Sequence, residues 1–426
     1  MSAEDFKMKK IMGRKIAALL MAAFFISAVS AKEKAPYRVS VQNIEAEGSI
    51  KPDKYNRQLG YQITDEGKSL QFVFVPSVWK IEKPLEVYVE GSFNGWAKKS
   101  PDWELKKIKN QLWTLECPVE DIKIPGNSGF PEFKFIVIGE VEYIESVCGK
   151  DITRTKKQTF EPNAVSRIPG YQMASNNLIL FPEDNPEDVI KNVELSKTVK
   201  KLKEYNLEEE ADRERIANFR KVPGTTSLYR GYHPYKISRG HLDTEKPRIN
   251  AVNQLLKAKG VQSIITLSGN EQIDSKNESI SVYVMDIRQN GNQFFVNTHY
   301  NTVYYKSASR EFGEMMGDIV RFIDTHPAPY YVHCRLGTDR TGVISAVLAA
   351  LSGASWEEIA ADYQKTNELG IQEVRDWRLL KYSFEKMLGK PMEEVTDLQK
   401  ELSTFFIENK FFSSADFEAL KKKLSE

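Results

Sequence analysis

Short runs in which apolar and polar residues alternate dominate residues 70–182. They read LQFVFV, LEVYVEGSF, LWTLECPV, EFKFIVIG and NNLILFP, and Gly, Pro, Asn and Asp separate them. Alternation with a period of two between turn residues is typical of antiparallel strands. Several such strands in succession predict an all-β sandwich, which we place at residues 38–182.

The pattern changes to helical spacing after the predicted sandwich. Residues 183–214 are rich in Glu, Lys, Asp and Leu, which indicates a charged helical linker exposed to solvent. From residue 215 onward, apolar runs such as VQSIITL and SVYVMDI, which we interpret as strands, alternate with helical segments. These helical segments lie at 250–259, 308–325, 341–352 and 356–367.

This alternation of strands and helices predicts a second domain of a different class. It indicates an α/β fold, in which helices flank a central, mainly parallel sheet, over residues 215–388. Charged helices over residues 389–426 are expected to form a C-terminal helical tail that packs on this domain or trails from it.

The N-terminus differs from both domains. Basic residues between Lys7 and Lys15 precede an apolar run over 16–29, and small residues follow up to Ala31. This order predicts a secretory signal peptide over residues 1–31 and an exported protein, periplasmic or secreted. The alternative is a buried helix or a membrane anchor, but the run is shorter than the roughly 20 residues that a spanning helix needs. We therefore expect no stable membrane anchor after signal cleavage.

Charge excludes one class of partner. The 426 residues include 60 Lys and Arg and 59 Asp and Glu, which leaves a formal net charge of +1. A basic domain would be expected of a protein that binds nucleic acid. Nucleic acid is therefore not predicted as a partner.

The three cysteines leave two arrangements open. Cys117 and Cys148 could form a disulfide in an oxidising compartment and leave Cys334 unpaired. Alternatively, Cys117 and Cys148 are both free thiols. In either arrangement Cys334 has no partner.

The stretch PYYVHCRLGTDRTGVISAVLAALSG carries the clearest chemistry in the chain. Residues 330–333 are expected to form a strand and residues from 341 onward a helix, so that residues 334–340 form the loop between them. Such a loop turns its backbone N–H groups into one concavity and adds the positive end of a helix dipole. The sequence therefore predicts a site for a tetrahedral dianion.

Each residue type in the loop suits the transfer of a phosphoryl group. A thiol attacks phosphorus only as the thiolate, which the helix N-terminus, the loop dipoles and the neighbouring His333 are expected to favour in Cys334. Arg340, six residues later, can hold two phosphate oxygens, and Thr341 places a hydroxyl near the sulfur. No metal and no cofactor is required, since Arg340 and the amides carry the charge. The residues expected to line the phosphate site are His333, Arg335, Leu336, Gly337, Thr338 and Gly342.

The run HCRLGTDRTG resembles the signature loop of the protein-tyrosine and dual-specificity phosphatases, and its continuation is similar to that of bacterial members. The segments IANFRKVPGTTSLYRGYHP and KGVQSIITLSGNE resemble the opening segments of the same catalytic domains, so that the resemblance covers roughly residues 215–385. It implies a hydrolase that passes through a phosphocysteine intermediate. In this family a carboxylic acid protonates the leaving oxygen, and two residues fit: Asp286, at the end of SVYVMDI, and Asp339, inside the loop. Both remain candidates.

Residues 85–119, with the FKF run and a later NNLILF, resemble a glycogen-binding-type carbohydrate module with an immunoglobulin-like fold. The resemblance implies that Trp96 stacks on a sugar and that Lys134 and Asn177 bond its hydroxyls. Such modules usually carry a second Trp after the FKF strand. Val141 stands near that place here, which removes half of the stacking surface. The alternative is a sandwich that docks on the catalytic domain and uses Trp96 for packing.

Three functions follow from these patterns. The first is an exported tyrosine or dual-specificity phosphatase that acts on phosphoproteins. The second is a phosphatase for a phosphorylated glycan or an inositol phosphate, with glucan as a possible ligand of the sandwich. The third is a non-catalytic protein that binds a phospho-ligand or a glycan, which the intact pair of Cys334 and Arg340 disfavours.

Overall fold

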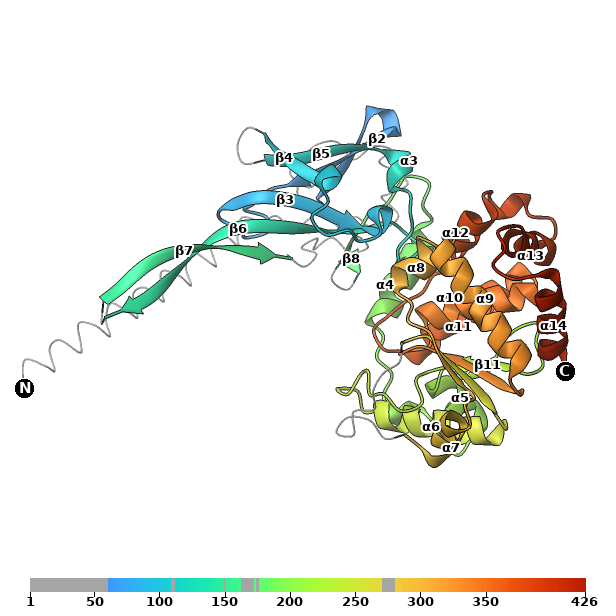
Figure 1. Ribbon diagram of the computed structural model, residues 1–426. Helices are drawn as coiled ribbons and strands as arrows, with labels where there is room; N and C mark the ends of the chain where they lie inside the picture. Colours follow the sequence, from blue (N-terminus) through green and yellow to red (C-terminus); the bar gives the residue numbers. More distant parts are fainter. Residues whose placement is uncertain (1–59, 109–111, 149, 162–171, 174–175, 270–279) are drawn as a thin grey trace, which may run out of the picture.

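The computed structural model describes residues 60–426 except 109–111, 149, 162–171, 174–175 and 270–279. The predicted signal peptide therefore lies outside the described residues. The described chain forms an N-terminal sheet domain and a C-terminal α/β domain, which lie against each other (Figure 1).

The N-terminal sheet domain is built from one curled antiparallel sheet with the strand order β1-β2-β5-β4-β3-β6-β9-β8, and β7 pairs with β6. The expected strands correspond to β2, β3, β5, β6 and β9. The expected sandwich of two sheets is instead continuous, because β4 pairs with both β3 and β5. The strands are β1 (Tyr61–Thr64), β2 (Ser69–Phe74), β3 (Pro84–Gly91), β4 (Glu104–Ile108), β5 (Leu112–Pro118), β6 (Glu132–Val147), β7 (Lys150–Phe160), β8 (Gln172–Met173) and β9 (Asn176–Leu178), with the short helix α3 (Val119–Ile122) after β5.

The hairpin of β6 and β7 extends far beyond the rest of this domain (Figure 1). Cys148 is exposed at its turn, whereas Cys117 lies half-buried on β5. Both thiols are free, so the alternative of a disulfide between them is wrong for this structure. The third thiol, Cys334, is buried and also free.

Helix α4 (Pro186–Lys197) is not the solvated linker that its charge predicts. Its Val189 and Val193 are buried in the core of the N-terminal sheet domain together with Val374 of the C-terminal domain. The charged residues occupy the other positions of the helix, so composition alone concealed its apolar side. The helix therefore belongs to the boundary between the two domains.

The C-terminal domain contains the expected mainly parallel sheet, with the strand order β10-β11-β14-β12-β13. Only β10 is antiparallel to its neighbour. The strands are β10 (Arg220–Lys221), β11 (Leu228–Gly231), β12 (Ser263–Thr266), β13 (Gln293–Phe295) and β14 (Tyr330–His333). Strand β14 lies at the centre, between β11 and β12.

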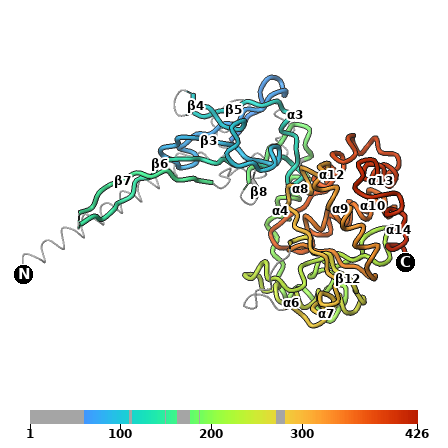
Figure 2. Tube along the Cα trace, viewed as in Figure 1, coloured from blue at the N-terminus to red at the C-terminus, as the bar shows by residue number. Residues whose placement is uncertain are grey.

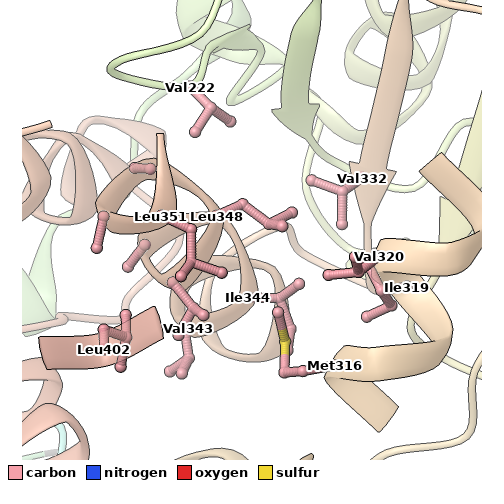
Figure 3. Close-up of a cluster of buried hydrophobic side chains, with 14 of the residues drawn as sticks. Val222, Met316, Ile319, Val320, Val332, Val343, Ile344, Leu348, Leu351 and Leu402 are labelled. Carbon is pink, nitrogen blue, oxygen red and sulfur yellow. The ribbon is translucent and has the colours of Figure 1, made fainter. Parts of the chain in front are cut away.

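Helices cover both faces of this sheet. One face carries α5 (Glu210–Ile216), α6 (Glu245–Ala258) and α7 (Val282–Gln289). The other face packs against the larger apolar core, in which residues of α9 and α10 meet Val332 and Leu402 (Figure 3). The remaining helices are α8 (Tyr300–Tyr304), α9 (Arg310–Thr325), α10 (Asp339–Leu351), α11 (Trp356–Lys365), α12 (Trp377–Leu388), α13 (Leu398–Glu408) and α14 (Ser414–Ser425).

Helix α7 corrects one predicted strand. The run SVYVMDI forms a helix because Val284 and Ile287, three residues apart, face the core, while Val282 is 77% exposed. The side chain of Ser281 also accepts a hydrogen bond from the backbone N–H of Val284, which caps the helix.

The C-terminal helices pack on the domain and do not trail from it. Leu402 of α13 and Leu420 and Leu424 of α14 are fully buried in the larger core. Figure 2 shows this red C-terminal segment beside the helices that cover the sheet. No helix within the described residues is long and apolar enough to cross a bilayer.

Candidate active site

The predicted phosphate loop lies where the sequence places it. Strand β14 ends at His333, residues 334–338 form a loop, and α10 begins at Asp339. Cys334 is 3% exposed at the carboxyl end of this central strand. Parallel strands β12 and β13 end at the same edge of the sheet, so their following loops form the opposite wall of the site.

Two side chains hold the back of the loop. The Nδ2 atom of Asn218 donates to the carbonyl oxygens of Leu336 and Gly337 at 3.3 and 3.1 Å, and Nη2 of Arg230 donates to Gly337 at 2.9 Å. These carbonyls therefore point away from the concavity. Within the described residues, the backbone N–H groups of 335–338 have no hydrogen-bond acceptor, which leaves them available to an anion.

A buried carboxylate holds this support in place. Asp362 accepts hydrogen bonds from Arg220 at 2.5 Å and from Arg230 at 2.7 Å. Burial acts to raise the pKa of Asp362, but the two guanidinium groups hold it below its ordinary value. The family-like segments around Asn218 and Arg230 thus brace the loop from behind.

Two glycines let the surrounding elements approach the loop. Gly337 has φ +73°, and a Cβ atom there would lie 2.2 Å from the carbonyl oxygen of Gly231. At Gly342 a Cβ atom would lie 2.8 Å from the ring of Tyr363. A side chain at either glycine, both of which were expected to line the phosphate site, would therefore collide with neighbouring parts of the protein.

Arg340 lies against the opposite wall. Its Nη1 atom donates to the carbonyl oxygens of Leu267 at 3.0 Å and Thr298 at 3.3 Å, just after β12 and β13. These contacts leave Nε and Nη2 without a partner among the residues that the structure covers. Arg340 is thus anchored by one nitrogen and can present the others to a phosphate.

His333 is a neutral scaffold residue. Its Nδ1 lies 2.9 Å from the carbonyl oxygen of Cys334, so Nδ1 carries the hydrogen, and Nε2 accepts from the Thr266 hydroxyl at 2.9 Å. Burial lowers its pKa to about 4, against a smaller opposite effect of the hydrogen bond to Cys334. His333 is therefore neutral near pH 7 and adds no positive charge beside Cys334.

Asp339 is fully engaged by donors. Arg375 binds it through Nε and, at 2.7 Å, Nη2, and the hydroxyls of Tyr304 and Thr338 donate at 3.2 and 3.1 Å. Burial acts to raise the pKa of Asp339, but Arg375 and the hydroxyls hold it below its ordinary value. This carboxylate is ionised near neutral pH, which suits a brace of the loop better than a proton donor.

Asp286 lies away from the loop. It is exposed on α7, and Tyr283, one turn earlier, donates its hydroxyl to the carbonyl of Val261 just before β12 begins. Cys334 follows the carboxyl end of β14, which is parallel to β12. Asp286 therefore lies at the edge of the sheet opposite to Cys334. The predicted strand SVYVMDI would have carried it toward the loop, but this run forms helix α7.

The other predicted loop residues divide into two groups. Arg335 is exposed at the start of the loop, and its contact with substrate stays a prediction. Leu336 packs against the apolar core that α5, α6 and α7 form with the sheet. Thr338 is 1% exposed and its hydroxyl donates to Asp339, so neither side chain faces substrate. The Thr341 hydroxyl is buried and has no hydrogen-bond partner among the described residues, the Cys334 sulfur included.

The three predicted sugar-binding residues do not share an open surface. Trp96 is half-buried beside Tyr305, which directly follows α8, and Lys134 is ion-paired with Glu90 and Glu161, each at 3.0 Å. Asn177 is 1% exposed. The arrangement supports the alternative in which Trp96 packs between domains.

Sequence reasoning missed Arg375 and Tyr304, which bond Asp339, and exposed His299, which lies between Thr298 and the first residue of α8. Arg375 lies 36 residues from Asp339 in a segment without regular structure, so no periodicity marks it. A metal site formed by three or more His, Cys, Asp or Glu side chains is not found among the described residues.

Part of the chain is similar to known proteins. No curated protein sequence matches the chain. The catalytic core of Siw14, a PP-IP phosphatase from S. cerevisiae, solved in complex with citrate, matches at 15% identity and a TM-score of 0.26, over 46% of this chain and 94% of that one. A second structure of the Siw14 catalytic core matches at 14% identity and 0.24, with the same coverage. A family model described as the tyrosine phosphatase family matches residues 201–425, just over half of the chain and the whole phosphate loop. The chain belongs to the tyrosine phosphatase family.

Proposed function

We propose that this protein is an exported phosphatase that hydrolyses phosphate monoesters, with protein phosphotyrosine as its substrate. The carrying observation is the loop at 334–340, whose carbonyls are held from behind while its amides and Arg340 face the concavity. A tetrahedral dianion fits such a set of donors.

The reaction has two steps. The thiolate of Cys334 attacks phosphorus, the bond from phosphorus to the leaving oxygen breaks, and that oxygen takes up a proton. Water then attacks the phosphocysteine, the sulfur–phosphorus bond breaks, and inorganic phosphate leaves with the thiolate restored. Arg340 and the amides of 335–338 bind the equatorial oxygens, whose charge they stabilise best in the transition state.

Neither Asp339 nor Asp286 is placed to give a proton to the leaving oxygen, and this favours an aryl ester over an alkyl ester as substrate. Asp339 is ionised in its pair with Arg375, and Asp286 lies at the far edge of the sheet. A phenol, with an ordinary pKa of about 10, leaves with less need of a proton than an alcohol does. Tyrosine phosphate therefore demands less of this site than serine phosphate.

The test is an assay with an aryl phosphate. We expect turnover in the wild type, none in Cys334→Ser, and a loss of about 100-fold or more in Arg340→Lys, which loses the bidentate contact. Cys117→Ser, the matched change at a thiol outside the site, should leave turnover unchanged. An inactive wild type on every phosphoester would overturn the proposal.

A substrate panel tests the ester. A phosphotyrosine peptide should be hydrolysed at least tenfold faster than a phosphoserine peptide, phosphorylated glucan or an inositol phosphate. The second candidate is a polyanionic small molecule, because exposed Arg335 adds a cation at the rim. Preference for inositol phosphate, reduced by Arg335→Ala, would establish that candidate instead.

Two further parts of the proposal concern the N-terminal half. Export predicts that the mature protein begins at Lys32, which N-terminal sequencing of the exported fraction checks. The N-terminal sheet domain serves to dock on the catalytic domain, so it should pass unretained through a glucan column. Retention that Trp96→Ala abolishes would show a sugar module.

A further inference from the structure

One residue of the N-terminal sheet domain touches two segments that lead to the phosphate loop. Asn127 lies between α3 and β6. Its backbone carbonyl accepts a hydrogen bond from the N–H of Asp376 at 2.9 Å, and its Oδ1 accepts from the Tyr300 hydroxyl at 3.0 Å. Both partners belong to the catalytic domain.

The first connection runs through the segment before α12. Asp376, which Asn127 holds, directly follows Arg375, whose guanidinium grips Asp339. The segment is tightly enclosed: a Cβ atom on Gly129 would lie 2.5 Å from the carboxyl carbon of Asp376. Val374 is buried in the core of the sheet domain. Arg375 therefore takes its position partly from that domain.

The second connection runs through α8. The ring of Tyr300 packs on that of Tyr304 at a centroid distance of 4.8 Å, and the Tyr304 hydroxyl donates to Asp339 at 3.2 Å. Asp339 is thus reached from Asn127 along two separate chains of contacts. It is also the first residue of α10 and the neighbour of Arg340.

We propose that Asn127 is a positioning residue of the phosphatase, through which the N-terminal sheet domain fixes Asp339 and with it the phosphate loop. Asn127 does not touch the substrate. It acts through Tyr300 and Arg375. The kinetic part of this proposal rests on the proposed phosphatase activity.

The kinetic experiment removes the hydrogen bond between the Tyr300 hydroxyl and Asn127 Oδ1, first from one residue and then from the other. Asn127→Ala and Tyr300→Phe should each lower kcat for an aryl phosphate by about fivefold, as expected for one hydrogen bond, while KM changes little. The double variant should lose no more than Tyr300→Phe alone, because that variant already removes the bond to Asn127 together with the contact between the Tyr300 and Tyr305 hydroxyls at 3.4 Å. Asn127→Asp keeps an acceptor for Tyr300 and should restore most of the rate.

The matched control is Asn301→Ala. Asn301 follows Tyr300 on α8, and its Nδ2 donates across the same boundary to the carbonyl of Gly95 at 2.6 Å, outside both connections. It should leave kcat within twofold of the wild type. Equal losses in Asn127→Ala and Asn301→Ala would mean that the boundary as a whole matters, and would overturn the proposal.

A second measurement needs no turnover. In the Cys334→Ser background, Asn127→Ala should accelerate amide hydrogen exchange of residues 335–340 and weaken binding of inorganic phosphate about fivefold, while Asn301→Ala should do neither. Unchanged exchange and binding would contradict the positioning function. An inactive wild type with the expected exchange would sink the proposed activity and leave the coupling intact.

Discussion

Asp339 shows how one side chain can look catalytic in a sequence and structural in a fold. It lies beside Arg340, where a proton donor would be useful, but it accepts from Arg375, Tyr304 and Thr338. A carboxylate with several donors is favoured in its charged form. The proton for the leaving oxygen must then come from another group, and we predict that the donor is exposed His299, which follows Thr298, whose carbonyl accepts from Arg340.

Substitutions distinguish His299, Asp286 and Asp339 as candidates for the proton donor. His299→Gln should lower turnover of an alkyl phosphate by 10-fold or more and leave p-nitrophenyl phosphate almost unaffected, because general acid catalysis matters most for a poor leaving group. Asp286→Asn should change neither rate. Asp339→Asn should lower both rates equally by loosening the loop. A loss confined to the alkyl substrate in Asp339→Asn would show that Asp339 is the acid after all.

His333 makes stability depend on pH. Its folded pKa of about 4 lies below the value of about 6.5 expected when unfolded, so between these limits the unfolded state binds more protons. Stability is therefore lost as pH falls through this window. Denaturant unfolding at pH 6.5 and 5 should show a loss that is about 1.5 kcal/mol larger than the loss in His333→Gln, in which buried His233, whose pKa is also lowered, still titrates. An equal loss in both proteins would mean that other groups cause it.

At the scale of elements, the junction of β14 and α10 depends on Gly337. Its φ of +73° already favours glycine, and a Cβ atom would collide with the backbone of Gly231 on β11. Gly337→Ala should therefore displace the loop and lower kcat/KM at least 100-fold. Gly291→Ala is the matched control, since Gly291 has φ +78° but open space around its Cβ position. Its activity should stay near wild type; comparable losses would implicate backbone strain alone.

The sequence predicts those elements that follow from local pattern, and fails where tertiary contacts decide the structure. The strand, loop and helix at 330–351 follow from local pattern, because a buried apolar strand and helix flank the loop. Local pattern failed at α7, whose short run VYVMDI fits a strand as well as a helix until its burial is known. It also failed at Arg375, whose pairing with Asp339 depends on tertiary contact.

At the scale of the molecule, the two domains share buried structure. Val374 of the catalytic domain packs in the sheet-domain core with Val189 of α4. On the same helix, Asn192 is 3% exposed and donates from Nδ2 to the Ser128 carbonyl and to Asp376, both at 2.8 Å. Such contacts connect the folding of one domain to that of the other.

This sharing predicts that the domains unfold together. Scanning calorimetry of the full chain should give one transition, and Asn192→Ala should lower its midpoint by about 2–4 °C, because a buried carbonyl and Asp376 both lose a donor. The control is Asn409→Ala, which removes an exposed hydrogen bond from the side chain of Asn409, the C-cap of α13, to the carbonyl of Phe405. It should shift the midpoint by less than about 1 °C. Two resolved transitions, of which Asn192→Ala moves only one, would show that the domains fold independently and that the phosphate loop does not need the N-terminal sheet domain for its stability.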